Sequence, residues 1–261
     1  MEMLAALDLP HAIAGLLVGT LVGLTGVGGG SLMTPLLVLF FGVSPATAVG
    51  TDLLFAAITK TVGVGVHHQR STIDWKIFRR LAIGSVPAAI VTLMALATFL
   101  RIGEADSDLI VTALGGLLLI TAVGLVFQRR LFAYGATRPL PQNHNLGPTI
   151  VLGAVLGVLV TITSVGAGAI GATVLVMLYR RLPISRIVGT DIAHAVPLAF
   201  IAGAGHWFIG DVDAKLLVTL LVGSIPGVIV GSLLSSRAPD TLLRYALAAV
   251  LTVSGARLLF H

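Results

Sequence analysis

Residues 15–57 read GLLVGTLVGLTGVGGGSLMTPLLVLFFGVSPATAVGTDLLFAA, and residues 153–196 repeat the pattern as GAVLGVLVTITSVGAGAIGATVLVMLYRRLPISRIVGTDIAHAV. In each stretch a glycine-rich break interrupts an apolar segment, and a Gly-Thr-Asp triplet follows it, at residues 50–52 and 189–191. Matching residues are 138 positions apart at the glycines and 139 apart from the triplets onward, so one insertion explains the difference. A repeat of this length in an apolar chain is typical of transporters built from two related halves.

The composition is that of an integral membrane protein. Of the 261 residues, 56% are hydrophobic and only 10% are charged, and the mean hydropathy is +1.04. These values lie well outside the usage of soluble domains, and apolar stretches long enough to span a bilayer recur along the chain. We therefore expect an all-α, polytopic integral membrane protein that is surrounded by the lipid bilayer.

The composition also excludes several functions. The chain has no cysteine, which rules out disulfides, thiolate metal sites and cysteine nucleophiles. The histidines do not have the spacing of a metal site, and the chain has no sizeable polar domain, so we predict no metal, no cofactor and no enzymatic activity. The net charge of +5 lies in connecting loops, where it indicates membrane orientation and not nucleic-acid binding.

Six apolar segments are each long enough to cross the membrane as one helix. They cover approximately residues 45–66, 78–100, 107–128, 184–208, 214–235 and 239–260.

Two further apolar regions, residues 11–41 and 147–179, are interrupted by breaks at residues 26–30 and 164–168. Glycine destabilises a helix interior by about 1 kcal/mol per residue, and each break contains several small residues. Each region is therefore either one broken helix that crosses the membrane or a re-entrant hairpin that enters and leaves on the same face.

The distribution of Lys and Arg distinguishes these two topologies. If both regions cross, the two faces carry nine and six basic residues, whereas two hairpins put twelve on one face and three on the other. The larger asymmetry is the one that the positive-inside rule expects. The twelve are Arg70, Lys76, Arg79, Arg80, Arg129, Arg130, Arg138, Arg180, Arg181, Arg186, Arg237 and Arg244, and the three are Arg101, Lys215 and Arg257.

We therefore predict two inverted repeats, each a re-entrant helical hairpin followed by three transmembrane helices. The first repeat covers residues 1–128 and the second residues 147–261, with residues 129–146 as a cytoplasmic linker. An odd number of spans per repeat inverts the second repeat relative to the first and leaves both termini outside the cytoplasm.

The two breaks are candidate binding sites for a small anion. A hairpin tip that stops inside the membrane must be buried in protein or line a polar cavity. The second helix of each hairpin would present its N-terminus there, with free N–H groups and partial positive charge, and glycine lets a ligand approach the backbone closely. The predicted substrate-binding residues are Thr25, Gly28, Gly29, Gly30 and Ser31 in the first break and Thr163, Ser164, Gly166 and Gly168 in the second.

The triplets place one carboxylate, Asp52 or Asp191, inside a span of each repeat. Carboxylates inside a membrane are expensive and are functional by default. Either they carry the protons of coupled transport, or they accept hydrogen bonds from the hairpin backbone and hold the breaks open. The neighbouring Thr51 and Thr190 either line the substrate path or bond back to their own helix.

Two further polar residues inside spans have no equivalent in the other repeat. Lys60 aligns with Ala199, and it is a counter-charge for the anion, a partner for Asp52 or a snorkelling side chain. His194 lies three residues after Asp191 on the same helical face, where it either relays protons or is a satisfied interior histidine.

The motifs GLTGVGGGSLMTPLL, VGTDLLFAAITKTVG and VGTDIAHAVPLAFIAG resemble those of the sulfite exporter TauE/SafE family, and the likeness covers residues 10–260. The resemblance implies a membrane protein of two related halves that moves sulfite, sulfonates or other sulfur-containing anions. The second break departs from the first, with Ala167 for Gly29, Ala169 for Ser31 and no proline that matches Pro35. The two halves therefore need not contact the substrate equally.

We predict a secondary transporter of a small sulfur-containing oxyanion, sulfite or an organosulfonate, in a bacterial-type inner membrane. Transport would proceed by alternating access and would be coupled to protons or to the membrane potential. Two alternatives are a passive anion channel of the same architecture and, from another class, a membrane enzyme or assembly factor.

Overall fold

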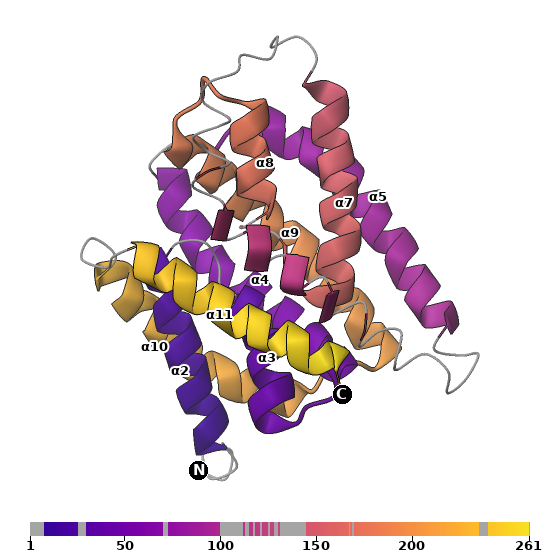
Figure 1. Cartoon of the computed structure of the whole chain (residues 1–261), viewed down its shortest axis with the longest axis vertical. Coiled ribbons are helices and arrows are strands. Elements are labelled where there is room, and N and C mark those ends of the chain that lie inside the picture. The colour runs from indigo at the N-terminus through magenta and orange to yellow at the C-terminus, as the bar shows by residue number, and fades with distance from the viewer. Residues whose placement is uncertain are drawn as a thin grey trace.

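The computed structural model describes residues 8–25, 30–69, 73–99, 145–166, 168, 170–234 and 240–260, together with single residues and short runs between 112 and 130. Every regular element in these ranges is an α-helix (Figure 1). The first half contains α2 (Leu9–Thr25), α3 (Gly30–Phe41), α4 (Pro45–Gln69) and α5 (Trp75–Phe99). The second half contains α7 (Leu146–Thr163), α8 (Ile170–Leu178), α9 (Ile184–Ile209), α10 (Ala214–Leu234) and α11 (Asp240–Leu259).

The helix pairs α2–α3 and α7–α8 are hairpins, because the start of the first helix lies beside the end of the second. In the first repeat the rings of His11 and Phe41 stack with centroids 4.2 Å apart. In the second repeat the hydroxyls of Thr149 and Tyr179 are 2.8 Å apart, and these two residues occupy the matching positions. The side-chain amide of Asn145 also donates to the carbonyl of Leu178 over 2.7 Å.

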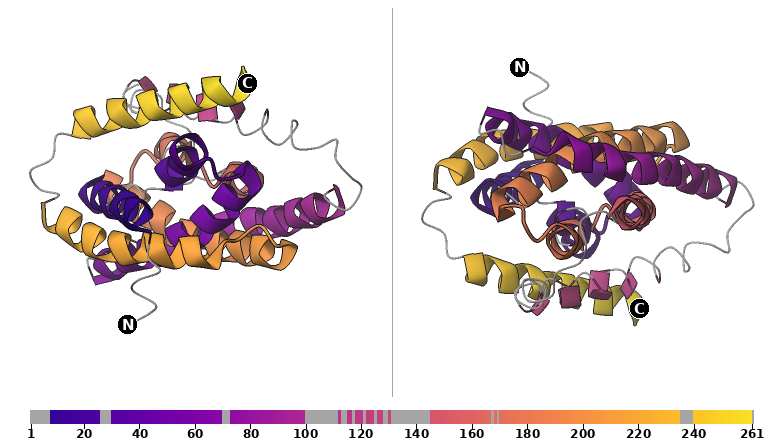
Figure 2. Two further views of the ribbon diagram at one scale, coloured as in Figure 1. Left: turned by 90° about the horizontal axis from the view of Figure 1, so that it is seen from below. Right: turned by 90° about the horizontal axis from the view of Figure 1, so that it is seen from above.

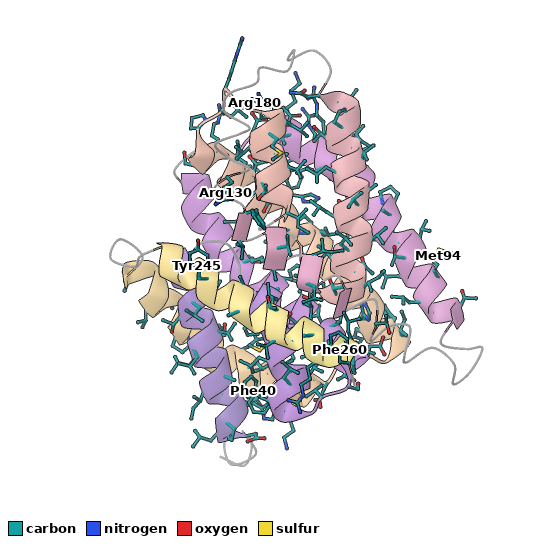
Figure 3. All side chains as sticks on the ribbon, viewed as in Figure 1. Phe40, Met94, Arg130, Arg180, Tyr245 and Phe260 are labelled. Carbon is teal, nitrogen blue, oxygen red and sulfur yellow. The ribbon has the colours of Figure 1, made fainter. Side chains whose placement is uncertain are left out.

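The open ends of the two hairpins lie toward opposite ends of the molecule. Figure 3 places Phe40, the penultimate residue of α3, in the lower part of the long axis and Arg180, two residues after α8, at the top. The polar side chains near the upper end include Arg80, which donates to the Tyr179 hydroxyl over 3.0 Å.

Each hairpin packs on a helix of the other repeat through glycines. Gly15 and Gly19 of α2 have no room for a Cβ beside the backbone of Leu220 and Ser224 in α10. The matching contacts join α7 to α5. They put Gly153 against Leu81 and Gly157 against Ser85. Small residues at this spacing bring helix backbones together in membranes, and here the first helix of each hairpin packs in this way on a helix of the other half.

The two helices that carry the triplets, α4 and α9, pack against each other in opposite directions. Gly50 in α4 lies against His206 near the end of α9, whereas Leu54, one turn further along α4, lies against Gly203. Most side chains in the middle of both helices are buried, including residues 51–57 and 189–195. This helix pair therefore forms the centre of the protein.

The last helical segments of the two halves cover one side of the α4–α9 pair. Figure 2 shows α11 and the described residues between 112 and 130 together as an outer layer. Gly115 packs against the segment that contains Gly255, and Gly255 packs against the segment that contains Gly115. The last predicted helix of each repeat therefore contacts its counterpart.

Four helical segments of the described chain are long and apolar enough to cross a membrane: Trp75–Thr98, Leu146–Thr163, Ser185–Ile209 and Ala214–Gly231. Three of them match predicted spans within a few residues. The fourth is α7, one arm of the second hairpin. We expected each arm to be too short to cross comfortably alone, and α7 has 18 residues. Outward-facing apolar side chains such as Met94 and Phe208 are exposed in the isolated chain, as expected for a lipid-facing surface.

Candidate functional site

The carboxylate of Asp52 is fully buried and is bound to its own hairpin. Its Oδ2 accepts a hydrogen bond from the backbone N–H of Thr34 over 3.1 Å and one from the Thr34 hydroxyl over 2.6 Å. Thr34 is the fifth residue of α3, so the negative charge lies at the positive end of that helix. The bond from the Thr34 N–H is of the kind that the second hypothesis for the triplet carboxylates expects, and their role in holding the breaks open stays a prediction.

Asp191 occupies the matching position in the second repeat but has a different environment. It is 1% exposed, and its carboxylate interacts with the backbone N–H of Gly168 in the break. Gly171, in the first turn of α8, leaves no room for a Cβ beside Asp191 Oδ1. This oxygen has no hydrogen-bond partner among the described residues.

Lys60 is a buried cation that acts on both carboxylates. Its side chain is 6% exposed and interacts electrostatically with Asp191 of the second repeat and with Asp52 of its own helix. It forms no close ion pair with either in the part of the chain that the structure describes. Two buried carboxylates therefore share one ammonium group, and the cluster spans both repeats.

His194 lies at the edge of this cluster. Its Nε2 is 2.8 Å from the hydroxyl of Ser85 in α5, and its Nδ1 has no partner among the described residues. Lys60 acts on it electrostatically, and the ring of Phe78 meets it edge-on. The structure thus brings all four predicted coupling residues together at the centre of the fold, although their role in coupling stays a prediction.

The second break has the backbone shape that its glycines predict. Ser164 ends α7 in the left-handed region with φ 57°, and Gly166 and Gly168 follow with φ of 122° and 108°. Because side chains are strained in that region, glycine suits both positions. The backbone carbonyl of Gly166 accepts hydrogen bonds from the N–H groups of Ile170 and Gly171 at the start of α8.

The hydroxyls of the second break point inward. Thr163 Oγ1 donates to the carbonyl of Leu159 and accepts from the N–H of Val165, so it closes the end of α7. The Ser164 hydroxyl is buried beside the Asp52 carboxylate without completing a hydrogen bond among the described residues. The tip of the second hairpin therefore approaches the carboxylate of the first repeat.

The first break lies outside the described residues at Gly28 and Gly29. Thr25 ends α2, and Gly30 and Ser31 begin α3, which agrees with a helix break between residues 25 and 30. The predicted roles of these five residues in substrate binding stay predictions.

Thr51 and Thr190 are both fully buried, and both hydroxyls join the two repeats. Thr51 Oγ1 accepts from the backbone N–H of Asp213 over 3.2 Å, and Thr190 Oγ1 accepts from that of Asp74 over 2.8 Å. Thr190 also donates to the carbonyl of Arg186 one turn earlier. The expected bond to its own helix is present for Thr190, and substrate lining stays a prediction for both.

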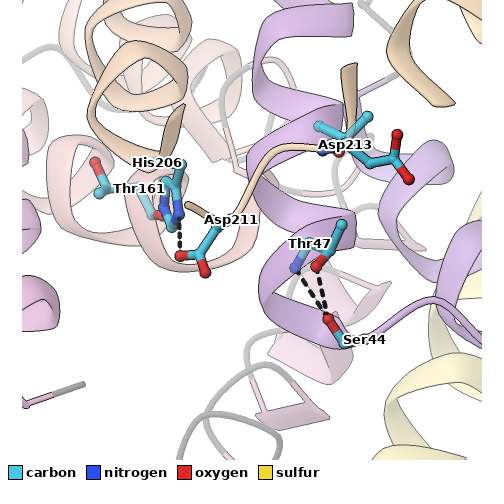
Figure 4. A network of polar contacts seen from close by, with 7 residues as sticks. Ser44, Thr47, Thr161, His206, Asp211 and Asp213 are labelled. Carbon is cyan, nitrogen blue, oxygen red and sulfur yellow. Dashed lines mark hydrogen bonds and ion pairs between the residues drawn. The ribbon is translucent and has the colours of Figure 1, made fainter. Parts of the chain in front are cut away.

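One polar residue of this region differs from the sequence-based expectation, which placed it at the membrane interface. His206 is only 3% exposed near the end of α9, whereas histidines at the ends of spans are usually interfacial. Its Nδ1 is 3.0 Å from Asp211 Oδ2, and its Nε2 is 2.9 Å from the carbonyl of Thr161 in α7 (Figure 4). The repeat itself was a signal, because His206 and Asp213 match His67 and Asp74.

The described residues contain no group of three His, Asp or Glu side chains that would hold a metal ion. The chemistry of this centre is therefore that of two carboxylates, one ammonium, several hydroxyls and helix N-termini. Such groups bind and release protons and small ions.

The family model of the sulfite exporter TauE/SafE matches residues 11–258. The chain belongs to this family. The family assignment confirms the resemblance seen in the motifs, and it is that of a membrane transporter and not of an enzyme. The apolar helices agree with it, so the TauE/SafE protein described here is a multi-pass membrane protein.

Several curated relatives align along nearly the whole TauE/SafE chain. The "Probable membrane transporter protein YjnA" of Bacillus subtilis is 41% identical over 252 residues, which cover 95% of this chain and 98% of the relative. YdhB of the same organism, with the same description, is 30% identical over 94% of this chain and 97% of its own length. MJ0441 of Methanocaldococcus jannaschii is 25% identical over 93% of this chain and 92% of its own length. No solved structure matches the chain.

Proposed function

We propose that this TauE/SafE protein is a secondary transporter that moves a small sulfur-containing oxyanion, sulfite or an organosulfonate, by alternating access coupled to protons. The observation that carries the proposal is the central cluster, in which Asp52 and Asp191 each face the tip of their own hairpin and share Lys60.

The anion would bind between the two hairpin tips. The second helix of each hairpin begins there, and its N-terminal N–H groups favour a negative ligand. In the second break, Gly166 and Gly168 keep the backbone open, and the Ser164 hydroxyl is available as a donor. A tetrahedral or pyramidal oxyanion accepts several such hydrogen bonds at once.

Coupling would follow from the charge balance of the cluster. With both carboxylates ionised, the cluster carries one more negative than positive charge, and an entering anion is repelled. At an effective dielectric constant of about 20, two like charges ~6 Å apart repel by about 3 kcal/mol. A proton that neutralises Asp52 or Asp191 removes this repulsion, so anion and proton bind more tightly together than apart.

We also propose that the two repeats are inverted in the membrane and that both hairpins are re-entrant, from opposite faces. The opposite directions of α4 and α9, and the positions of Phe40 and Arg180 toward opposite ends of the molecule, support this arrangement. The basic residues near Arg180 and in the 129–146 linker would then face the cytoplasm, and both termini would face the outside of the inner membrane.

Uptake into liposomes that contain the purified protein tests the proposal. Sulfite, thiosulfate, sulfoacetate and sulfate are offered side by side, with and without a pH gradient, while the membrane potential is clamped to zero. We expect saturable uptake of at least one sulfur oxyanion that rises at least tenfold with the gradient and falls when a protonophore is added. Flux that does not saturate would identify a channel, and uptake indifferent to the gradient would refute proton coupling.

A further inference from the structure

Each Gly-Thr-Asp triplet makes contacts in two directions. Asp52 and Asp191 face the hairpin of their own repeat, whereas the preceding Thr51 and Thr190 accept a hydrogen bond from the opposite repeat. The donors are the backbone N–H groups of Asp213 and Asp74, which occupy matching positions. A contact that joins the repeats is thus one residue away from each proposed proton site.

The residue that donates to each threonine hydroxyl also caps the start of a helix. Asp74 Oδ1 accepts from the N–H groups of Lys76 and Ile77 at the start of α5, and Asp213 Oδ1 accepts from that of Leu216 in α10. These are N-cap bonds, which stabilise the first turn of each helix. The threonine hydroxyls therefore bind a capped helix end, and movement of that end moves the whole helix.

The two contacts lie toward opposite ends of the central helix pair. Thr51 is near the start of α4 and Thr190 is near the start of α9, and these helices run in opposite directions. Both hydrogen bonds are present in the same structure. A hydrogen bond between the repeats is therefore present toward each end of the helix pair.

The contact at Thr51 has additional support. Gly50 leaves no room for a Cβ beside the backbone carbonyl of Asp211, so the connection between α9 and α10 packs tightly on the triplet. Asp211 in turn binds His206 (Figure 4). The carbonyl of Thr161 only accepts, so His206 Nε2 donates to it, while Nδ1 lies 3.0 Å from Asp211 Oδ2. These two contacts tie the connection to α7 and fix it against Gly50.

We propose that the pairs Thr51–Asp213 and Thr190–Asp74 are the two gates of the transporter, and that they open alternately. This inference rests on the proposed transport function. A neutral hydroxyl–amide bond contributes only about 1 kcal/mol net, so each gate opens at small cost when substrate or proton binding shifts the balance. The threonine hydroxyls in this role hold the repeats together and do not bind the anion. The gate at Thr51 is the stronger one, because His206 and Asp211 reinforce it.

Cross-linking tests the gates in a chain that has no native cysteine. The double variants T51C/D213C and T190C/D74C are each reconstituted, cross-linked with a short thiol reagent and compared with the same protein after reduction. We expect each cross-link to reduce sulfite uptake at least twentyfold and reduction to restore it. The matched control is H11C/F41C, which joins two helices of one hairpin and should leave uptake within twofold. Uptake that survives a complete cross-link at either gate would overturn the proposal.

Two milder variants disturb folding less, and they distinguish a gating role of the threonines from a role in substrate binding. T51V and T190V remove only the hydroxyl. We expect sulfite to bind to the detergent-solubilised variants within twofold of the parent, while the transport rate changes about fivefold, as about 1 kcal/mol implies. Binding weakened more than tenfold would identify the hydroxyls as substrate ligands and refute their role as gates. If the parent protein itself takes up no anion, the proposed function fails first.

Discussion

The two repeats place the same carboxylate against the same helix end, but they hold it in different ways. In the first repeat Asp52 accepts two hydrogen bonds from Thr34, one from the backbone and one from the hydroxyl. In the second, Asp191 lies against the glycines Gly168 and Gly171. In both repeats Oδ1 of the carboxylate has no hydrogen-bond partner among the described residues.

This difference concerns the donors that hold each carboxylate, because Oδ1 of Asp52 and Oδ1 of Asp191 both lack a hydrogen-bond partner among the described residues. Hydrogen bonds to a charged group are stronger than those between neutral groups, so the two bonds from Thr34 fix Asp52 against α3. A buried oxygen without a donor costs about 1–3 kcal/mol, and binding of a proton removes part of this cost at either site. We therefore expect Asp52 to hold its hairpin more firmly than Asp191 does, and Asp191 to move more readily when it binds a proton.

The largest expected effect follows from removal of either charge. Asp191→Asn should abolish proton-driven anion uptake, more than a hundredfold, because an amide binds no proton. Asp52→Asn should also abolish coupled uptake, since the charge balance of the cluster is lost, yet it should leave more residual anion exchange because the amide oxygen still accepts from Thr34. Liposome uptake with and without a pH gradient measures both.

The control for these variants is Asp8→Asn at the exposed start of α2, where the carboxylate pairs only with His11. It should transport at the rate of the parent protein. Normal uptake with unchanged pH dependence in both Asp52→Asn and Asp191→Asn would refute the role of these residues in coupling.

The next effect tests how closely Asp191 approaches α8. In Gly171→Ala the new Cβ would overlap Asp191 Oδ1, so the carboxylate must move away from the hairpin tip. We expect uptake to fall at least tenfold and the melting temperature in detergent to drop by several degrees, as overpacking costs about 1–3 kcal/mol. Gly147→Ala is the matched control, because a Cβ there has no atom within 4 Å. Equal behaviour of the two variants would contradict the close contact.

A smaller effect is expected for the Thr34 hydroxyl, which binds Asp52 and has no counterpart beside Asp191 among the described residues. Thr34→Val keeps the backbone donor and removes the 2.6 Å bond to Asp52. Hydrogen bonds to charged groups contribute about 1.5–3 kcal/mol, so we expect a roughly tenfold loss of uptake. Thr59→Val is the control, since the buried Thr59 hydroxyl bonds only to carbonyls of its own helix. A loss of uptake as large in the control would show that the effect is not specific to Asp52.

The smallest effect concerns Ser85 and its counterpart Ser224. Ser85 binds His194, whereas the residue that matches His194 in the first repeat is Phe55, which offers no hydrogen-bonding atom, and the Ser224 hydroxyl has no partner among the described residues. Ser85→Ala should slow uptake about two- to fivefold, and Ser224→Ala should leave it unchanged, in the same liposome assay. A reversed order would show that His194 does not depend on Ser85.

Much of the architecture was predictable because the internal repeat and the distribution of charge can be read directly from the sequence. The two glycine breaks, the triplets at 50–52 and 189–191 and the matching motifs predicted two related halves, and the reciprocal contacts of α2 with α10 and of α7 with α5 agree with them. The predicted helix bounds lie within a few residues of α9 and α10. Apolar length sets these bounds, and it is a local property.

The contacts between repeats were not predictable in the same way. Nothing in the sequence distinguishes a Thr51 that lines a path from one that accepts a bond from Asp213, which lies in the other repeat. The burial of His206 was missed for the same reason, because its partners Thr161 and Asp211 lie in different elements.

The sequence by itself determined the class of this protein, its two-fold repetition, its family and the identity of the polar residues at its centre, because hydropathy, glycine clusters and motifs act locally along the chain. Only the tertiary structure decided that Lys60 interacts with carboxylates of both repeats and that Asp52 and Asp191 have different partners. Hydrogen bonds and Coulomb forces depend on distances of a few ångströms, and those distances are set by how the two repeats pack.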